Sequence, residues 1–147
     1  MRRHARRHRL SDDGYTLVEI LVVLAIIGLL AAVLTPNLIG QLGRARAKTA
    51  QVQLETLAAA VESFRSDVGR YPTNSEGLTV LLAQPGGVDG WVGPYIKGAK
   101  ALNDPWGHPV QYQESDDALT FQVISLGADG QPNGQGLNAD LHAPSTQ

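Results

Sequence analysis

The residues best suited to chemistry lie near the C-terminal end, in a segment rich in glycine, asparagine and aspartate. Residues 127–140 hold Asp129 and Asp140, with Asn133 and Asn138 between them. Hard cations such as calcium bind six to eight oxygens from carboxylates, amide side chains and backbone carbonyls. Glycine lets the backbone turn its carbonyls inward. The spacing is not that of an EF-hand, so on composition alone a solvated loop without a metal is the favoured alternative.

Glu19 also needs a chemical explanation, because it stands at the head of a strongly apolar segment. Residues 20–34 contain no polar side chain. Together with residues 15–19 they would form about 30 Å of helix, enough to span the apolar core of a bilayer. A carboxylate at the centre of a bilayer costs about 2.5–3.5 kcal/mol. Glu19 therefore either lies at the membrane surface, where it is solvated, or pairs with a positive charge.

Cleavage of the chain between Gly14 and Tyr15 would create a positive charge, the ammonium group of a new N-terminus. Glu19 lies four residues after Tyr15, one helical turn away on the same face. In a bundle of helices the Glu19 carboxylate could instead reach the ammonium group of a neighbouring copy. A slip of one residue would then leave a charge unpaired in apolar surroundings. This pairing predicts a fixed axial register between copies of the chain.

No arrangement of residues predicts catalysis. The sequence contains no GxSxG, Walker A, HExxH or CxxC pattern and no cysteine. His108 lies between Gly107 and Pro109, where a solvated or packing role in a turn is expected. The chain is therefore predicted not to be an enzyme. Because a small exported domain without disulfides needs another source of stability, a bound metal ion is the candidate.

Charge is distributed unevenly along the 147 residues. Five of the 12 Lys and Arg side chains lie within residues 1–9, whereas the chain after residue 14 carries seven basic and 12 acidic side chains. A basic run next to a long apolar segment sets membrane topology, and this explanation is favoured over a nucleic-acid-binding arm. Only three basic residues (Arg44, Arg46 and Lys48) closely follow the apolar segment. The bias predicts a cytoplasmic N-terminus and a periplasmic C-terminal domain.

The elements that position these residues are one long helix and a small β-sheet. No small-x-small cleavage site follows the apolar segment, so it is expected to stay in the mature chain rather than be removed as a signal peptide. Helical patterning runs to about residue 67, with apolar residues at spacings of three and four: Ala47, Ala50, Leu54, Leu57, Ala58, Val61, Phe64 and Val68. Residues 110–113 and 119–125 predict a β-hairpin. A short helix is expected around residues 77–82, and residues 142–147 are expected to form a frayed tail.

The start of the chain resembles the cleavage and methylation signal of type IV pilins and type II pseudopilins. A basic leader ends at Gly14 and is followed by an apolar helix that begins Tyr15, Thr16, Leu17, Val18 and Glu19. The resemblance implies cleavage after Gly14 by prepilin peptidase, N-methylation of Tyr15 and a required acidic residue, Glu19. Tyr15 stands where the family usually has phenylalanine.

Later segments resemble the major pseudopilins of the type II secretion system. The matching residues are Arg70, Tyr71, Pro72, Thr73, Glu76, Gly77 and Leu78, then the turn at residues 103–109 with Asp104, Pro105, Trp106 and Gly107, and finally residues 121–140. These motifs occur in the expected order and cover about residues 8–141. The absence of cysteine fits as well, because many type IV pilins close their C-terminal region with a disulfide.

The resemblance also implies a calcium site with oxygens from the Leu126 carbonyl and from the carboxylates of Asp129 and Asp140. Ala139 stands where many members of the family have a second acidic residue. Asn138, backbone oxygens or water are therefore expected to complete the coordination.

We predict an α+β, type IV pilin-like fold, in which a long N-terminal helix packs on a small antiparallel β-sheet with a C-terminal calcium loop. The predicted segments are a cleaved leader (residues 1–14), a transmembrane and filament-core helix (15–36) and a periplasmic domain (37–147). The expected location is the inner membrane, with a single span. The expected partners are other copies of the chain in a helical filament, minor pseudopilins, prepilin peptidase and the inner-membrane assembly platform of the type II secretion system. The filament would drive the export of folded proteins across the outer membrane.

Two alternatives stay open at this point. The first is a type IV pilin that forms long surface fibres. The second is a membrane-anchored binding or enzymatic domain whose N-terminal segment is only a signal anchor.

Overall fold

The computed structural model describes residues 15–144, and at residues 34–38 it describes the backbone only. The predicted leader, including the cleavage residue Gly14, lies outside the described residues. The chain divides into two compact units, one up to Leu38 and the other from Ile39 onward. Among the described residues, the buried apolar core lies in the second unit.

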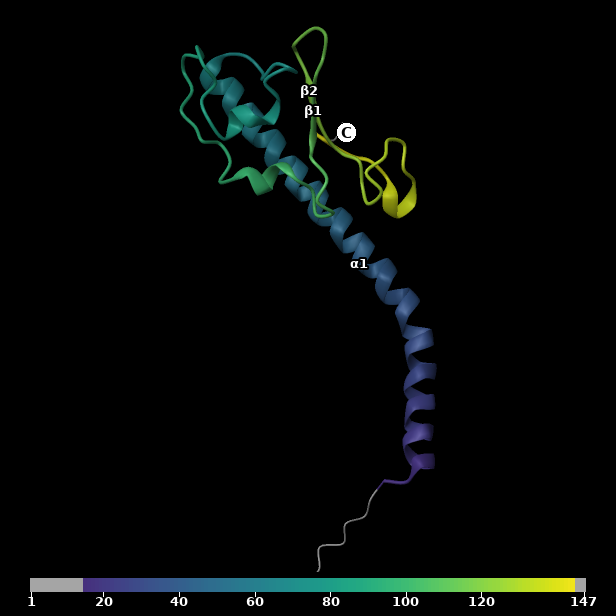
Figure 1. Ribbon diagram of the computed structural model, residues 1–147. Helices are drawn as coiled ribbons and strands as arrows, with labels where there is room; N and C mark the ends of the chain where they lie inside the picture. Colours follow the sequence, from purple (N-terminus) through teal and green to yellow (C-terminus); the bar gives the residue numbers. More distant parts are fainter. Residues whose placement is uncertain (1–14, 145–147) are drawn as a thin grey trace, which may run out of the picture. The chain divides into compact units, whose positions relative to one another are not determined.

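The helix α1 spans Leu17–Val68 and contributes to both units (Figure 1). It begins after Thr16, whose Oγ1 accepts the backbone N–H of Glu19 at 3.2 Å and so caps the first turn. It ends before Gly69, which adopts a φ of +84° and donates its N–H to the carbonyl of Arg65. The observed ends are close to those predicted. Within residues 15–144, no helix has a stretch both long enough and apolar enough to cross a membrane.

The later part of α1 forms the core of the second unit. The predicted apolar face is confirmed: its side chains are buried at six positions and half-buried at Ala47 and Val68, the buried ones being Ala50, Leu54, Leu57, Ala58, Val61 and Phe64. Full burial of a side chain such as leucine or phenylalanine contributes about 1.5–3 kcal/mol. This helix face is therefore the main apolar surface on which the rest of the unit packs.

The predicted β-hairpin is confirmed. The strands β1 (Gln111–Glu114) and β2 (Phe121–Ser125) pair antiparallel, with Glu114 opposite Phe121 and Gln111 opposite Ile124. Residues 121, 123 and 125 are buried in alternation, as expected for a strand with one face on the core. Phe121 and Val123 join the same apolar cluster as the buried residues of α1.

A third strand, β3 (Leu141–Ala143), pairs antiparallel with β2 and completes a sheet of order β1-β2-β3. The prediction of a frayed tail is therefore wrong at residues 142 and 143. Ala143 is fully buried, and the His142 carbonyl accepts a hydrogen bond from Gln51 Nε2 of α1 at 3.2 Å. Pairing with β2 satisfies backbone groups that a free tail would leave to water.

Short 3₁₀ turns connect these elements. The first, Gly77–Leu81, confirms the short helix expected there, and it buries Leu78, Val80 and Leu81. Two others, Ala99–Leu102 and Gly136–Asn138, are not predicted from the sequence. One long helix with a small antiparallel sheet confirms the α+β class.

Candidate assembly segment and metal loop

The segment predicted to mediate assembly has described side chains at residues 15–33, and all of them are exposed in the single chain. The exposed fraction reaches 88% at Leu17. Glu19 is exposed in the first turn of α1, where its backbone N–H is held by Thr16. Tyr15 precedes the helix and is 79% exposed. The Glu19 carboxylate is therefore free to meet a partner from another molecule.

The loop predicted to bind metal is closed at its base by the sheet. Leu126 directly follows β2 and Asp140 directly precedes β3. Ser125 pairs with Leu141 across the two strands, so the two ends of the loop are neighbours. The sheet therefore brings together two predicted ligands that are 14 residues apart in the sequence.

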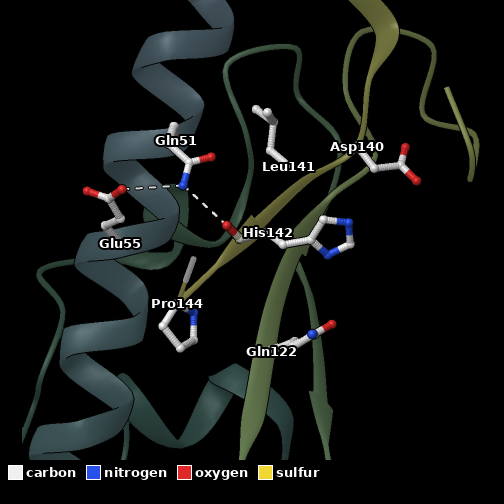
Figure 2. A pocket seen from close by; sticks show the side chains of 7 residues that line it. All are labelled: Gln51, Glu55, Gln122, Asp140, Leu141, His142 and Pro144. Atoms are coloured by element: carbon white, nitrogen blue, oxygen red, sulfur yellow. Dashed lines mark hydrogen bonds between the residues drawn. The ribbon is translucent and has the colours of Figure 1, made fainter. Parts of the chain in front are cut away.

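Asp140 is the most informative residue of this loop. Its Oδ2 accepts the N–H of Asn133 at 2.8 Å, whereas its Oδ1 is buried and has no hydrogen-bond partner among the described residues. Figure 2 shows that this carboxylate points away from Gln51 and Glu55, which lie across a pocket from it on α1. Because a buried, unpaired carboxylate oxygen is costly and rare, Asp140 is suited to a ligand that supplies positive charge.

Two glycines allow carbonyl oxygens to come close to the loop backbone. A Cβ added at Gly127, whose φ is +67°, would lie 2.5 Å from the Asn138 oxygen and 2.8 Å from the Ala139 oxygen. A Cβ at Gly134 would overlap the Asn138 oxygen. Only glycine fits such close approaches. The loop is therefore compact, and backbone oxygens of its last turn face its beginning.

The other predicted ligands are less constrained. Asp129 is exposed, and its Oδ1 accepts the N–H of Gln131 at 3.1 Å; Asn138 is exposed in the 3₁₀ turn. Among residues 15–144, no group of three or more His, Cys, Asp or Glu side chains is placed to hold a metal ion. A cation here would have to draw mainly on backbone oxygens, with the buried Oδ1 of Asp140 as the carboxylate oxygen. Such a donor set fits a hard cation such as calcium.

The sequence predicted a solvated or packing role for His108 but not that its side chain contacts the loop. His108 Nδ1 lies 3.0 Å from the Gly127 carbonyl oxygen, although a turn position between glycine and proline gives no local indication of this contact. A Cβ at Gly130 would lie 3.1 Å from the His108 ring. His108 therefore packs against the first part of the loop.

A second irregular segment, residues 70–76, satisfies its own polar groups. Arg70 binds Glu76 through two parallel bonds of 2.7 and 2.8 Å, and the N–H and Oγ1 of Thr73 donate to Glu76 Oε2 at 2.8 and 3.0 Å. Glu76 N–H donates back to Thr73 Oγ1 at 3.3 Å. The Arg70 hydrogen bonds, with those from Thr73, lower the pKa of Glu76 to about 2. These hydrogen bonds hold the chain in a fixed turn directly after α1, so the segment has a structural role.

Comparison with protein families gives two matches that together cover most of the chain. Residues 37–144 match the family described as "Type II secretion system (T2SS), protein G". Residues 9–35 match the "Prokaryotic N-terminal methylation motif".

Individual relatives and a solved structure agree with these matches. Type II secretion system core protein G of Xanthomonas campestris pv. campestris is 39% identical over 90% of both chains. The core protein G of Vibrio cholerae is 37% identical over 89% of this chain and 90% of its own. The crystal structure of the major pseudopilin from the type 2 secretion system of enterohaemorrhagic Escherichia coli superposes with a TM-score of 0.56. It is 28% identical and covers 74% of this chain and 94% of that chain.

Proposed function

The chain belongs to the type II secretion system protein G family and is a pseudopilin; from this premise we propose that it is the main subunit of a periplasmic filament. Prepilin peptidase cuts after Gly14, and Tyr15 is N-methylated. The mature chains polymerise, and filament growth moves folded proteins across the outer membrane.

The family matches confirm the predicted resemblance and the type IV pilin-like fold. They also favour a pseudopilin over a type IV pilin that forms surface fibres. The family consists of structural subunits, and we propose that this chain likewise catalyses no reaction.

The observation that carries the proposal is the uncovered apolar surface of α1. Large apolar side chains stay exposed along the whole of residues 17–33, including Ile20 (45%), Leu24 (63%) and Leu29 (69%). A continuous apolar surface of this kind marks an interaction site. Lipid covers it before assembly in this proposal, and the helices of neighbouring copies cover it in the filament. The Glu19 carboxylate then meets the N-terminal ammonium group of a neighbour.

The location and partners follow from this proposal. The N-terminal methylation motif supports anchoring in the inner membrane. Although no helix of the described residues is by itself long and apolar enough to cross a membrane, we propose that residues 15–36 anchor the chain as a single span, with the N-terminus cytoplasmic and the domain from residue 37 periplasmic. As a pseudopilin, the chain assembles with other components of the type II secretion system. The specific partners proposed are prepilin peptidase, the minor pseudopilins and the inner-membrane assembly platform.

We further propose that the loop binds calcium through the Leu126 carbonyl, Asp129, Asn138 and Asp140. The unpaired buried oxygen of Asp140 supports this assignment, as do the close-packed carbonyls at Gly127. Bound calcium would neutralise the carboxylate and fix the carbonyls.

The assembly role is tested with Glu19→Ala. Without the carboxylate, we expect the subunit to reach the membrane at the normal level but to fail to form filaments, because its register loses the pairing charge. Asp116→Ala is the matched control, since it removes an exposed carboxylate in the hairpin turn. Normal filaments and normal secretion from Glu19→Ala cells would count against the proposal.

Processing is tested by mass spectrometry of the protein extracted from membranes. The expected mature chain starts at Tyr15 and carries one added methyl group. An intact Met1 would favour a simple signal anchor. A strain that lacks this chain should lose secretion of its exported proteins; normal secretion together with loss of long surface fibres would favour a type IV pilin.

A further inference from the structure

Asp104 is a buried carboxylate that lies beneath the start of the loop. It is 6% exposed, and both of its oxygens are used. Its Oδ1 accepts the backbone N–H groups of Trp106 at 3.0 Å and His108 at 2.8 Å. Its Oδ2 accepts the hydroxyl of Ser125 at 2.7 Å. Oδ2 also lies 3.7 Å from His108 Nδ1, so the carboxylate contacts both the local turn and the end of β2.

The turn that carries Asp104 is held firmly in place. Asp104 N–H donates to the His108 carbonyl at 2.8 Å, and Asn103 forms an antiparallel bridge with Pro109. Gln53 of α1 donates to the Asn103 carbonyl at 2.6 Å. The Asp104 carboxylate is therefore fixed relative to α1, and it fixes in turn the Ser125 hydroxyl that it binds.

The two residues that flank Leu126 are both tied to this turn. Ser125, fully buried, donates to Asp104 and accepts the N–H of Gly127 at 3.3 Å. On the other side, Gly127 brings its carbonyl oxygen to 3.0 Å from His108 Nδ1. The backbone on each side of Leu126 is therefore fixed by one turn that lies some 20 residues earlier in the sequence.

We propose that Asp104 is a positioning residue for the calcium loop, acting through Ser125 and together with His108 to orient the peptide that presents the Leu126 carbonyl. This inference rests on the proposed calcium site. Groups that orient metal ligands typically change metal affinity by about 10- to 100-fold when they are removed. A loop whose first carbonyl is already oriented loses less conformational freedom when calcium binds.

The alternative role for Asp104 is purely local stabilisation of the turn, and the geometry separates the two roles. Asp104→Asn keeps one carbonyl oxygen that can accept the turn N–H groups. It replaces the oxygen that accepts from Ser125 with an NH₂ group, which can only donate, so the Ser125 hydroxyl loses its buried acceptor. Ser125→Ala removes the same link from the other side, together with the acceptor of the Gly127 N–H, and leaves the backbone hydrogen bonds of the turn in place. Turn stabilisation alone would not make these two variants behave alike toward calcium.

The experiment measures calcium affinity by titration calorimetry on the full chain in detergent, well below the melting temperature. We expect Asp104→Asn and Ser125→Ala each to bind calcium about tenfold more weakly than the wild type. Because Asp104 acts on the loop through Ser125, the double variant should be no weaker than Ser125→Ala alone. Asp117→Asn, an equal change at an exposed carboxylate, should bind like the wild type. His108→Ala, which removes the other anchor, carries the test if Asp104→Asn does not fold.

The outcomes separate this inference from the calcium proposal. Wild-type protein that binds no calcium overturns both. Wild-type protein that binds calcium, with Asp104→Asn and Ser125→Ala binding equally well, overturns the positioning role alone. A lower melting temperature in chelator with unchanged affinity also overturns it, since that result shows a structural role only.

Discussion

Residues 70–76 and residues 126–140 are both irregular segments next to regular elements, but they satisfy their polar groups in opposite ways. In the first, the Glu76 carboxylate receives hydrogen bonds from Arg70 and Thr73, so its charge is balanced within the chain. In the second, one oxygen of the Asp140 carboxylate is buried without a partner among the described residues. The first segment balances its charge by itself, whereas the second leaves a carboxylate oxygen that a cation would neutralise.

This difference predicts how each segment responds to its surroundings. The stability of a segment that pairs its charges internally depends on pH, because protonation of the carboxylate breaks the pairs. The stability of a segment with an unpaired carboxylate depends on the concentration of the cation that neutralises it. Substitutions that change the pH dependence of stability but not its calcium dependence, or the reverse, test this difference between the two segments.

The largest effect is expected for Asp140→Ala. Calcium at about 100 times its dissociation constant stabilises a folded protein by about 2.7 kcal/mol, and this variant should lose that gain. In chelator the change should be much smaller, because the substitution also removes the unpaired oxygen. Thermal unfolding with calcium and with chelator measures both quantities, and Asp116→Ala is the control. If calcium stabilised Asp140→Ala as much as the wild type, the proposal that residues 126–140 need a cation would be wrong.

The next effect concerns how the loop packs against α1. A Cβ at Gly43 would lie 3.1 Å from Leu137 Cδ1 in the loop, so Gly43→Val should push the Leu137 side chain aside and cost about 1 kcal/mol more than a matched substitution. Gly40→Val is the matched control, since the nearest heavy atom there is the end of the Arg44 side chain at 3.6 Å. Chemical unfolding in calcium compares the two variants. An equal change of stability in both variants would contradict the contact with Leu137, because the higher helix propensity of valine over glycine acts alike at both positions.

The smallest effect is expected for Glu76→Gln, which should cost about 1 kcal/mol at neutral pH, a modest value because the Arg70 side chain is 41% exposed. The folded-state pKa of Glu76 lies below its ordinary value of 4.5, at about 2. Its contribution is therefore present above pH 4.5 and disappears as the pH falls toward about 2.

Urea unfolding of the wild type and of Glu76→Gln, from neutral pH down to the acid range, measures the difference in their free energies of unfolding. The gap between wild type and Glu76→Gln should narrow as the solution is acidified, and calcium should not affect it. A gap that stays constant with pH would contradict the internal pairing of this segment.

Several features were predictable because their causes are local. Apolar residues at helical spacing gave the buried face of α1, and Gly69 marked its end. Alternation of residues gave the β1–β2 hairpin. The strand β3 was not predictable in the same way, because three residues carry no recognisable pattern and pair only when β2 offers a free edge.

The amino-acid sequence by itself determined the family, the long helix with its apolar start, the position of Glu19 and the glycine-rich loop with its two aspartates, since each depends on the order of neighbouring residues. Only the tertiary structure decided that Asp140 buries an unpaired oxygen and that Asp104 reaches Ser125. Both depend on burial and on contacts between distant residues, which exist only once the sheet has packed against α1.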